Sequence, residues 1–222
     1  RTAETFGEDP FLVSEIGRGF IQGMMGNDPV YLKTVPCGKH YLANNSEFNR
    51  HTGSSNMDER DMREFYLAPY RKLIREYKLP SIMTAYNAVN GVPVSASRFL
   101  VDTIARKTYG LDGYVTGDCG AIDDIVRGHF YTKSFEEAAA MGLKSGVDSD
   151  CGGVYQNHIQ GALKNGLLTI GDIDRALINL FTIRMRLGEF DQKAKVPFAG
   201  IKPGIINDPS HHNLAIKKKK KT

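Results

Sequence analysis

The stretch Leu111-Asp112-Gly113-Tyr114-Val115-Thr116-Gly117-Asp118-Cys119-Gly120 predicts a turn, a short strand and a carboxylate at the end of that strand. Residues 114–116 favour a strand because aromatic and β-branched side chains fit a pleated surface. Asp118 follows the strand at its carboxyl end, which is where α/β barrels carry their catalytic groups. The glycines on either side allow a ligand or another backbone to approach closely. The same carboxylate can instead cap a helix over residues 121–126, and this stretch alone does not separate the two roles.

Strands and helices alternate through the first 190 residues. Short strand-forming runs predict four strands, at residues 31–35, 80–86, 114–116 and 147–150. Capping residues followed by a helical apolar period predict helices that begin after Asp9, Asp58, Ser97 and Ser134, with further helices at residues 155–164 and 173–187. Pro69 should kink the second of these helices, because proline lacks the backbone N–H.

Four strands joined by helix-length crossovers indicate a parallel sheet with outer helices. A complete eight-stranded barrel takes about 250 residues, so four strands make about half of one. We therefore expect an α/β fold in which residues 1–190 form the C-terminal part of a (β/α)8 TIM-type barrel. Residues 191–222 contain three prolines and a lysine run and are expected to be a linker and a Lys-rich tail. The open edges of a half barrel should favour association with another chain.

The bulk composition excludes several classes of protein. The 222 residues are 41% hydrophobic, which is enough to bury a core, and no apolar run is long enough to span a membrane. The net charge of +4 misleads, because five of the 29 basic residues are Lys217 to Lys221 and the rest of the chain is nearly neutral. We therefore expect neither a nucleic-acid partner nor a membrane partner, and interpret the lysine run as a solvated tail.

The three cysteines form no CxxC pair and no metal spacing. Their odd number argues against a disulfide framework. Cys119 and Cys151 both follow an aspartate at a predicted strand end and can therefore be neighbours in space. The favoured interpretation of the cysteines is nevertheless small buried thiols.

Polar side chains follow each of the four predicted strands. They are Lys39, His40 and Arg50 after the first, Met83, Tyr86 and Asn87 at the second, Asp118 after the third, and Asp148 and Asp150 at the fourth. If the strands are parallel, these groups meet at one face of the sheet. Two cations, an imidazole, a phenol and a carboxylate suit a ligand with several hydroxyls, such as a sugar. Taken singly, each residue has an ordinary alternative role as a surface charge, a hydrogen-bonded core histidine or core packing.

Four motifs, in order along the chain, resemble those of glycoside hydrolase family 3. They are Arg1-Thr2-Ala3-Glu4-Thr5-Phe6-Gly7-Glu8-Asp9-Pro10, then Lys39-His40-Tyr41-Leu42-Ala43-Asn44-Asn45 with Arg50, then Met83-Thr84-Ala85-Tyr86-Asn87 with Asn90-Gly91-Val92-Pro93, and Gly113-Tyr114-Val115-Thr116-Gly117-Asp118. The resemblance runs to about Asp191 and covers most of the chain.

The resemblance implies a retaining β-glycosidase in which Asp118 is the nucleophile. It also implies that the non-reducing sugar of a β-linked oligosaccharide or glycoside is bound by Arg1, Lys39, His40, Arg50, Met83 and Tyr86. No cofactor is expected for this chemistry, and the sequence contains no Gly-rich phosphate loop.

The sequence departs from the family pattern around the nucleophile. Gly117 stands where a serine is usual, and Cys119 stands where many members carry tryptophan. The Asp118-Cys119-Gly120 run and Asp148 to Gly152 are more similar to the β-xylosidase branch than to the typical β-glucosidase.

By the same resemblance, the early barrel strands lie before Arg1 and the acid/base glutamate lies in a second α/β domain beyond Thr222. These parts are expected to be supplied elsewhere or by oligomerisation. Glu47 is the only nearby carboxylate in this chain that could replace that glutamate. The expected activity is hydrolysis of terminal non-reducing β-D-glucosyl or β-D-xylosyl residues with retention. The alternative is a truncated, non-catalytic carbohydrate-binding or scaffold fragment.

Overall fold

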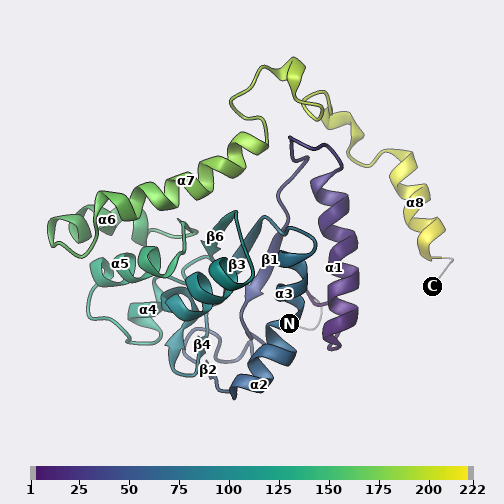
Figure 1. Ribbon diagram of the computed structural model, residues 1–222. Coiled ribbons are helices and arrows are strands. Elements are labelled where there is room, and N and C mark those ends of the chain that lie inside the picture. The colour runs from purple at the N-terminus through teal and green to yellow at the C-terminus, as the bar shows by residue number, and fades with distance from the viewer. Residues whose placement is uncertain (1–3, 220–222) are drawn as a thin grey trace.

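The computed structural model describes residues 4–219 and is built on a four-stranded parallel sheet (Figure 1). The strand order is β1-β3-β6-β7, and the strands are Cys37–Tyr41, Ser81–Thr84, Tyr114–Gly117 and Ser149–Asp150. Parallel strands need long crossovers, and helices supply them here. The predicted α/β fold with a parallel sheet and outer helices is confirmed. Within residues 4–219 the sheet is open, with β1 and β7 at its edges, so the described strands do not close a barrel.

Helices surround this sheet and join its strands. The α-helices are α1 (Pro10–Met25), α2 (Glu59–Asp61), α3 (Ala68–Arg75), α4 (Asp124–Arg127), α5 (Phe135–Ser145), α6 (Val154–Lys164), α7 (Ile170–Arg186) and α8 (Pro209–Lys219). Wider π-helical turns form η2 (Met62–Tyr66) and η4 (Phe99–Thr108), and short 3₁₀ turns form η3 (Val94–Ala96), η5 (Lys193–Lys195) and η6 (Pro203–Ile205). In Figure 1, α1 and α3 lie beside β1, α5 and α6 lie on the side of β6 away from β1, and α7 crosses one end of the sheet.

Local capping explains where several helices begin and end. The Asp9 side chain accepts a hydrogen bond from the Phe11 N–H, and Pro10 occupies the first turn of α1. The Ser134 side chain accepts from the Glu137 N–H at the start of α5. That helix ends at Gly146, whose φ of 105° is a left-handed conformation that glycine adopts without strain. The predicted boundaries of these two helices are therefore confirmed.

The helix predicted after Asp58 is divided into three parts around Pro69. Asp58 caps α2, the chain then widens into the π-helical segment η2, and α3 resumes with Pro69 in its first turn. The Leu67 N–H bonds to the Met62 carbonyl across the widened turn. A proline cannot donate to the preceding turn and its ring crowds that turn, so the interruption falls just before Pro69.

The strand predicted at residues 31–35 is wrong. The backbone there bonds to helix ends instead of to the sheet, with the Leu32 N–H donating to Arg186 O at 2.8 Å and the Lys33 N–H donating to Met25 O at 2.8 Å. The edge strand β1 begins further along the chain. As a result, Lys39 and His40 lie within β1 rather than beyond its end.

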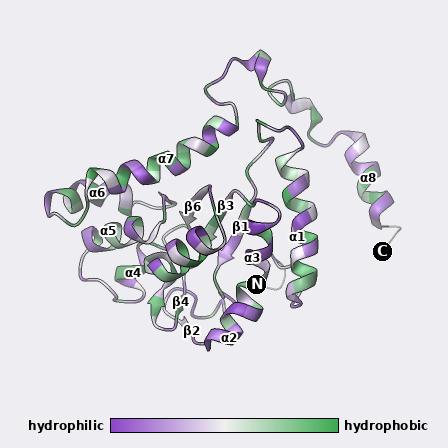
Figure 2. Ribbon diagram, in the orientation of Figure 1, coloured by the Kyte–Doolittle hydropathy of each residue, from purple (hydrophilic) through white to green (hydrophobic). Residues whose placement is uncertain are grey.

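The apolar face predicted for α1 is mostly exposed in the described structure. Ile21 is buried, but Phe11, Leu12, Ile16, Phe20 and Met24 all expose more than a third of their surface. Figure 2 shows hydrophobic residues along much of this helix. The core is centred on the sheet, where Ile82 and Val115 of the central strands are buried with Leu100 and Ile104 of η4.

A second, small sheet braces the long polar loop that follows β1. Strand β2 (Ser54–Ser55) pairs in parallel with β4 (Ala88–Val89), and β4 pairs antiparallel with β5 (Val92–Pro93). The Ala88 N–H also donates to the Gly53 carbonyl at 2.9 Å. These bonds attach the end of the loop to the segment that follows β3.

Beyond α7 the chain contains the short turns η5 and η6 and then α8. Figure 1 shows α8 lying apart from the sheet. The predicted division between a barrel part at 1–190 and a linker with tail at 191–222 stays a prediction. None of the helices within residues 4–219 is long and apolar enough to cross a membrane.

Candidate active site

The carboxyl ends of β1, β3 and β6 lie next to one another and bring the predicted site residues into one region. Strand β3 pairs with β1 on one side and with β6 on the other. The Asp118 N–H donates to Thr84 O at 3.1 Å, so the residue that follows β6 is anchored at the end of β3. The parallel sheet, and not proximity along the chain, therefore places Asp118 beside residues from the other two strands.

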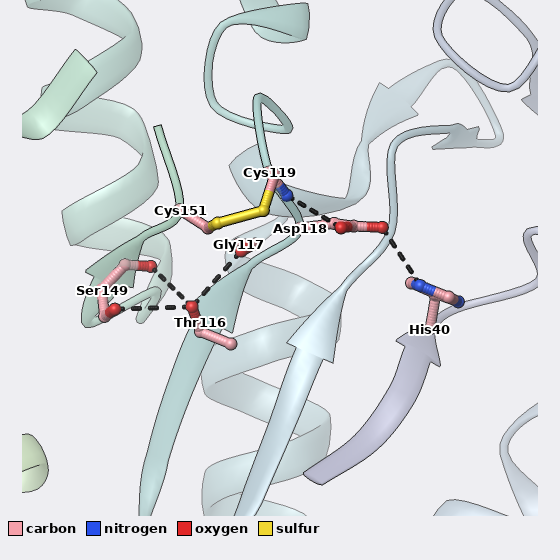
Figure 3. Close-up of a disulfide and its surroundings, with 7 residues drawn as sticks. All are labelled: His40, Thr116, Gly117, Asp118, Cys119, Ser149 and Cys151. Carbon is pink, nitrogen blue, oxygen red and sulfur yellow. Dashed lines mark hydrogen bonds and ion pairs between the residues drawn. A yellow bond between two sulfur atoms is a disulfide. The ribbon is translucent and has the colours of Figure 1, made fainter. Parts of the chain in front are cut away.

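His40 and Asp118 face each other across the strand ends (Figure 3). His40 Nε2 lies 3.1 Å from Asp118 Oδ2, and their side chains are 7% and 13% exposed. The other carboxylate oxygen, Oδ1, accepts the Cys119 backbone N–H at 2.8 Å. A nearly buried carboxylate with both oxygens contacted has a fixed direction, which a nucleophile or a hydroxyl-binding group requires.

Lys39 and Met83 lie close to this pair but contact it differently. Lys39 Nζ is 3.5 Å from His40 Nε2 and 3.9 Å from Glu4 Oε1, with its side chain 46% exposed. Met83 is half-buried on β3 and pairs in register with Thr116 of β6. The structure thus places Lys39 beside His40 and Met83 in the strand next to Asp118. Arg1 lies outside the described residues, so its predicted role stays a prediction.

Arg50 and Tyr86 form a second group beside the strand ends. The Arg50 guanidinium carbon lies 4.8 Å from the centroid of the Tyr86 ring, and Tyr86 is 8% exposed. Arg50 Nη1 also pairs with Glu47 Oε2 at 3.1 Å. Glu47 is therefore bound to a cation in the same loop.

Three further residues in this region were not identified from the sequence. His51 packs its ring against Tyr86, with centroids 4.4 Å apart, and its Nδ1 lies 2.7 Å from Asp124 Oδ2. His129 Nε2 lies 2.8 Å from the Tyr86 backbone oxygen. Burial raises the pKa of Asp124, and the hydrogen bond with His51 opposes that rise. No sequence motif marked these residues, although His51 directly follows Arg50.

The interpretation of the cysteines as buried thiols is wrong for two of the three. Cys119 and Cys151 form a disulfide that joins the end of β6 to the end of β7 (Figure 3). The Gly120 N–H donates to the Cys151 carbonyl at 2.8 Å beside it. Parallel pairing of β6 with β7 brings together two cysteines that each follow a strand end. Cys37 is free, and burial raises the pKa of its thiol.

The polar residues at the fourth strand serve the fold. The carboxylate of Asp148 is buried and accepts hydrogen bonds from Arg106, Asn179 and the Val115 N–H. Asp150 Oδ2 accepts the backbone N–H groups of the first two residues of α6 at 3.1 and 3.2 Å. These carboxylates stabilise a strand and a helix start, so the expectation that they join the site is not met.

Asn87, at the end of β3, is buried, and its side-chain amide donates to the carbonyls of Leu42 and Ala88. It therefore braces the loops around the site. Among residues 4–219, no group of three or more His, Cys, Asp or Glu side chains can hold a metal ion.

A large cavity adjoins the site, and Asp118 is not among the residues that line it. Its volume is about 630 Å³, and it lies between α1, β1 and α3. Lys39 and His40 line it from β1, and Phe20 and Tyr70 line it from the helices. This hollow follows the free edge of β1, while the residues around Asp118 lie at the carboxyl ends of the strands.

Comparison with known proteins gives a family match over most of the chain. Residues 1–183 match the model described as "Glycosyl hydrolase family 3 N terminal domain". A probable exo-1,4-beta-xylosidase of Neosartorya fischeri is 39% identical over 98% of this chain and 29% of its own length. Beta-D-xylosidase 1 of Arabidopsis thaliana is 36% identical over 97% of this chain and 28% of its own length. The chain therefore spans less than a third of these relatives.

Solved structures share the fold. A GH3 exo-beta-xylosidase in complex with a xylobiose aziridine activity-based probe is 34% identical, with a TM-score of 0.86 over 90% of this chain and 27% of that chain. A beta-glucosidase from Listeria innocua is 28% identical, with a TM-score of 0.81 over 93% of this chain and 29% of that chain.

Proposed function

The chain belongs to glycosyl hydrolase family 3, and on that premise we propose that it forms the nucleophile-bearing part of a retaining β-glycosidase. The proposed reaction is hydrolysis of terminal non-reducing β-D-xylosyl or β-D-glucosyl residues. The observation that carries the proposal is the contact between His40 Nε2 of β1 and Asp118 Oδ2 after β6, 3.1 Å apart across the end of β3. A carboxylate held in this way can attack an anomeric carbon bound above it.

The proposed reaction has two steps. Asp118 attacks the anomeric carbon, the bond to the leaving-group oxygen breaks, and a general acid protonates that oxygen. Water then attacks the anomeric carbon of the glycosyl ester and gives its proton to the conjugate base of that acid, which restores the Asp118 carboxylate and releases a sugar with retained configuration. Lys39, His40, Arg50 and Tyr86 are assigned to the sugar hydroxyls because their donors lie at or beside the strand ends where Asp118 lies, and Met83 and Arg1 are assigned to the same subsite.

We assign the general acid to a part of the longer protein outside this chain. Glu47, the nearby carboxylate, is paired with Arg50 at 3.1 Å. The chain matches only 29% of a xylosidase relative, whose remaining length could carry such a carboxylate. A further part of the longer protein is also proposed to cover the exposed apolar face of α1 and the free edge of β1. Without the acid, substrates with poor leaving groups should react slowly.

A β-xyloside is the preferred substrate in this proposal. Among the solved structures, the exo-beta-xylosidase is 34% identical to this chain, compared with 28% for the Listeria innocua β-glucosidase. Comparing kcat/KM for 4-nitrophenyl β-D-xyloside and β-D-glucoside tests this preference.

Covalent labelling tests the proposed function directly. A 2-fluoro-β-xyloside with a good leaving group should form a stable ester on Asp118, which peptide mass spectrometry detects. Asp118→Asn should abolish the label. Asp112→Asn, which changes an exposed aspartate before the same strand, should retain it. Labelling of Asp148 or Asp150 would refute the nucleophile assignment. Sugar binding without any label would favour a non-catalytic carbohydrate-binding protein.

An unactivated disaccharide tests whether the general acid lies outside this chain while the nucleophile lies within it. The chain tested by itself should cleave it far more slowly than an activated aryl glycoside, because acid assistance contributes about 10²–10⁴-fold where the leaving group is poor. Rapid cleavage of xylobiose by this chain alone would contradict the assignment of the acid to another part of the protein.

A further inference from the structure

His51 contacts both proposed sugar-binding side chains of its region and also the segment that follows the nucleophile. Its Nδ1 lies 2.7 Å from Asp124 Oδ2, its Nε2 accepts a hydrogen bond from Arg50 Nε at 3.2 Å, and its ring packs on Tyr86. His51 lies in the loop between β1 and β2, and Asp124 is the first residue of α4. One imidazole thus joins two segments that are 73 residues apart.

We propose that His51 and Asp124 are positioning residues that hold Arg50 and Tyr86 in place for the sugar. The proposal rests on the function proposed above, because it concerns the same sugar subsite. Neither residue is assigned contact with the sugar or with the reacting atoms. They act through Arg50 and Tyr86.

The hydrogen bonds determine which imidazole nitrogen carries the proton. Arginine has donors only, so the Nε2 atom that accepts from Arg50 is unprotonated in the neutral ring. The proton is then on Nδ1 and is donated to Asp124. The bonds form one directed chain, from Arg50 to His51 to Asp124. Removing the carboxylate frees the ring to rotate or to change tautomer, and Arg50 then loses its acceptor.

Arg50 is held from three sides. Glu47 accepts from Nη1, His51 accepts from Nε, and the Tyr86 ring lies 4.8 Å from the guanidinium carbon. Of the three guanidinium nitrogens of Arg50, Nη2 is the one that bonds to neither Glu47 nor His51. A guanidinium with its plane set in this way can direct that remaining nitrogen towards a hydroxyl acceptor.

The segment after Asp118 carries the other half of the support. The Ala121 N–H donates to Asp118 O at 2.8 Å, and the Asp124 N–H donates to Gly120 O at 2.9 Å. A short, tight turn therefore connects Asp118 to Asp124. The His129 N–H donates to Asp124 O at 2.7 Å. The His129 ring in turn contacts the Tyr86 carbonyl. The position of Asp124 therefore links the nucleophile to Tyr86 as well as to Arg50.

The burial of Asp124 separates this pair from an ordinary surface ion pair. Its side chain is only 14% exposed, although His51 is 48% exposed. Withdrawing a carboxylate from water is costly unless it is paired, and exposed pairs usually contribute little to stability. Asp124 is buried beside the site, and its partner His51 also binds Arg50. The pair therefore fixes the position of Arg50 as well as satisfying the buried carboxylate.

The test compares variants of the full protein with its best aryl β-glycoside and with the free monosaccharide as a product inhibitor. Asp124→Ala and His51→Phe should lower kcat/KM about 10- to 100-fold, because small displacements of binding groups have effects of this size. The inhibition constant of the monosaccharide should weaken by a similar factor. Asp124→Asn keeps an acceptor for Nδ1–H and should stay close to wild type.

A matched control and a double variant separate positioning from folding. His158 Nδ1 pairs with Glu136 Oε1 at 2.8 Å, and its ring packs on Phe135, but this pair lies on α5 and α6. Glu136→Ala should leave KM and the inhibition constant unchanged. In an Arg50→Met background, Asp124→Ala should add little further loss, because coupled residues do not act additively.

Each outcome decides between the alternatives. If Asp124→Ala lowers only the thermal midpoint, or if its effect multiplies fully with that of Arg50→Met, the positioning role is overturned while the proposed function stands. If the wild-type protein neither cleaves a β-glycoside nor binds the monosaccharide, the proposed function fails and the positioning role fails with it.

Discussion

Reducing the bond between Cys119 and Cys151 should destabilise the fold by about 3–4 kcal/mol. The two cysteines are 32 residues apart in the chain, and the segment between them contains α4 and α5. Closing a loop of about 32 residues removes about 12 cal/mol/K of entropy from the unfolded chain, or about 3.7 kcal/mol at 25 °C. With a urea dependence of about 2–3 kcal/mol/M, the unfolding midpoint should fall by about 1–2 M.

Urea unfolding with and without a phosphine reductant measures this shift. A thiol assay on the unfolded chain should find one free thiol before reduction, from Cys37, and three afterwards. The Cys119→Ser/Cys151→Ser variant should match the reduced protein and be insensitive to reductant. Cys37→Ser should keep the full difference between the oxidised and reduced forms. Equal midpoints for the oxidised and reduced wild type would refute the loop-closure reasoning.

The other stability predictions concern buried and terminal charges. Arg106→Met should lower the free energy of unfolding in urea by about 3–5 kcal/mol, because it leaves the buried carboxylate of Asp148 without its cation. Arg98→Met is the control, because Arg98 pairs with Asp102 at the surface. Equal effects of the two changes would contradict this reasoning. At the start of α7, the Thr169 backbone N–H holds the pKa of Asp172 below its ordinary 3.8, so this stabilisation is present above pH 3.8 and is lost as pH falls towards the depressed value. Asp172→Asn should therefore flatten the dependence of the unfolding midpoint on pH below 3.8, and an unchanged slope would count against it.

The sequence predicted correctly those features that depend on residues close together in the chain. Asp9 and Pro10 start α1, and Ser134 and Gly146 delimit α5, because caps act over a few residues along the chain. The alternation of strands and helices was enough to predict a parallel sheet. The order of the motifs was enough to identify the family, while the role of Asp118 stays a prediction.

Only the tertiary structure decided which distant residues meet. The strand order β1-β3-β6-β7 brings His40 to Asp118 and Cys119 to Cys151, and no local signal encodes that order. The same holds for His51, in the loop after β1, and Asp124, at the start of α4, which are 73 residues apart. Residues 31–35 include strand-forming side chains, yet their backbone bonds to the ends of α1 and α7 and not to a strand. A sequence determines the preferences of each segment, but the partner of each backbone and side-chain group is chosen by packing.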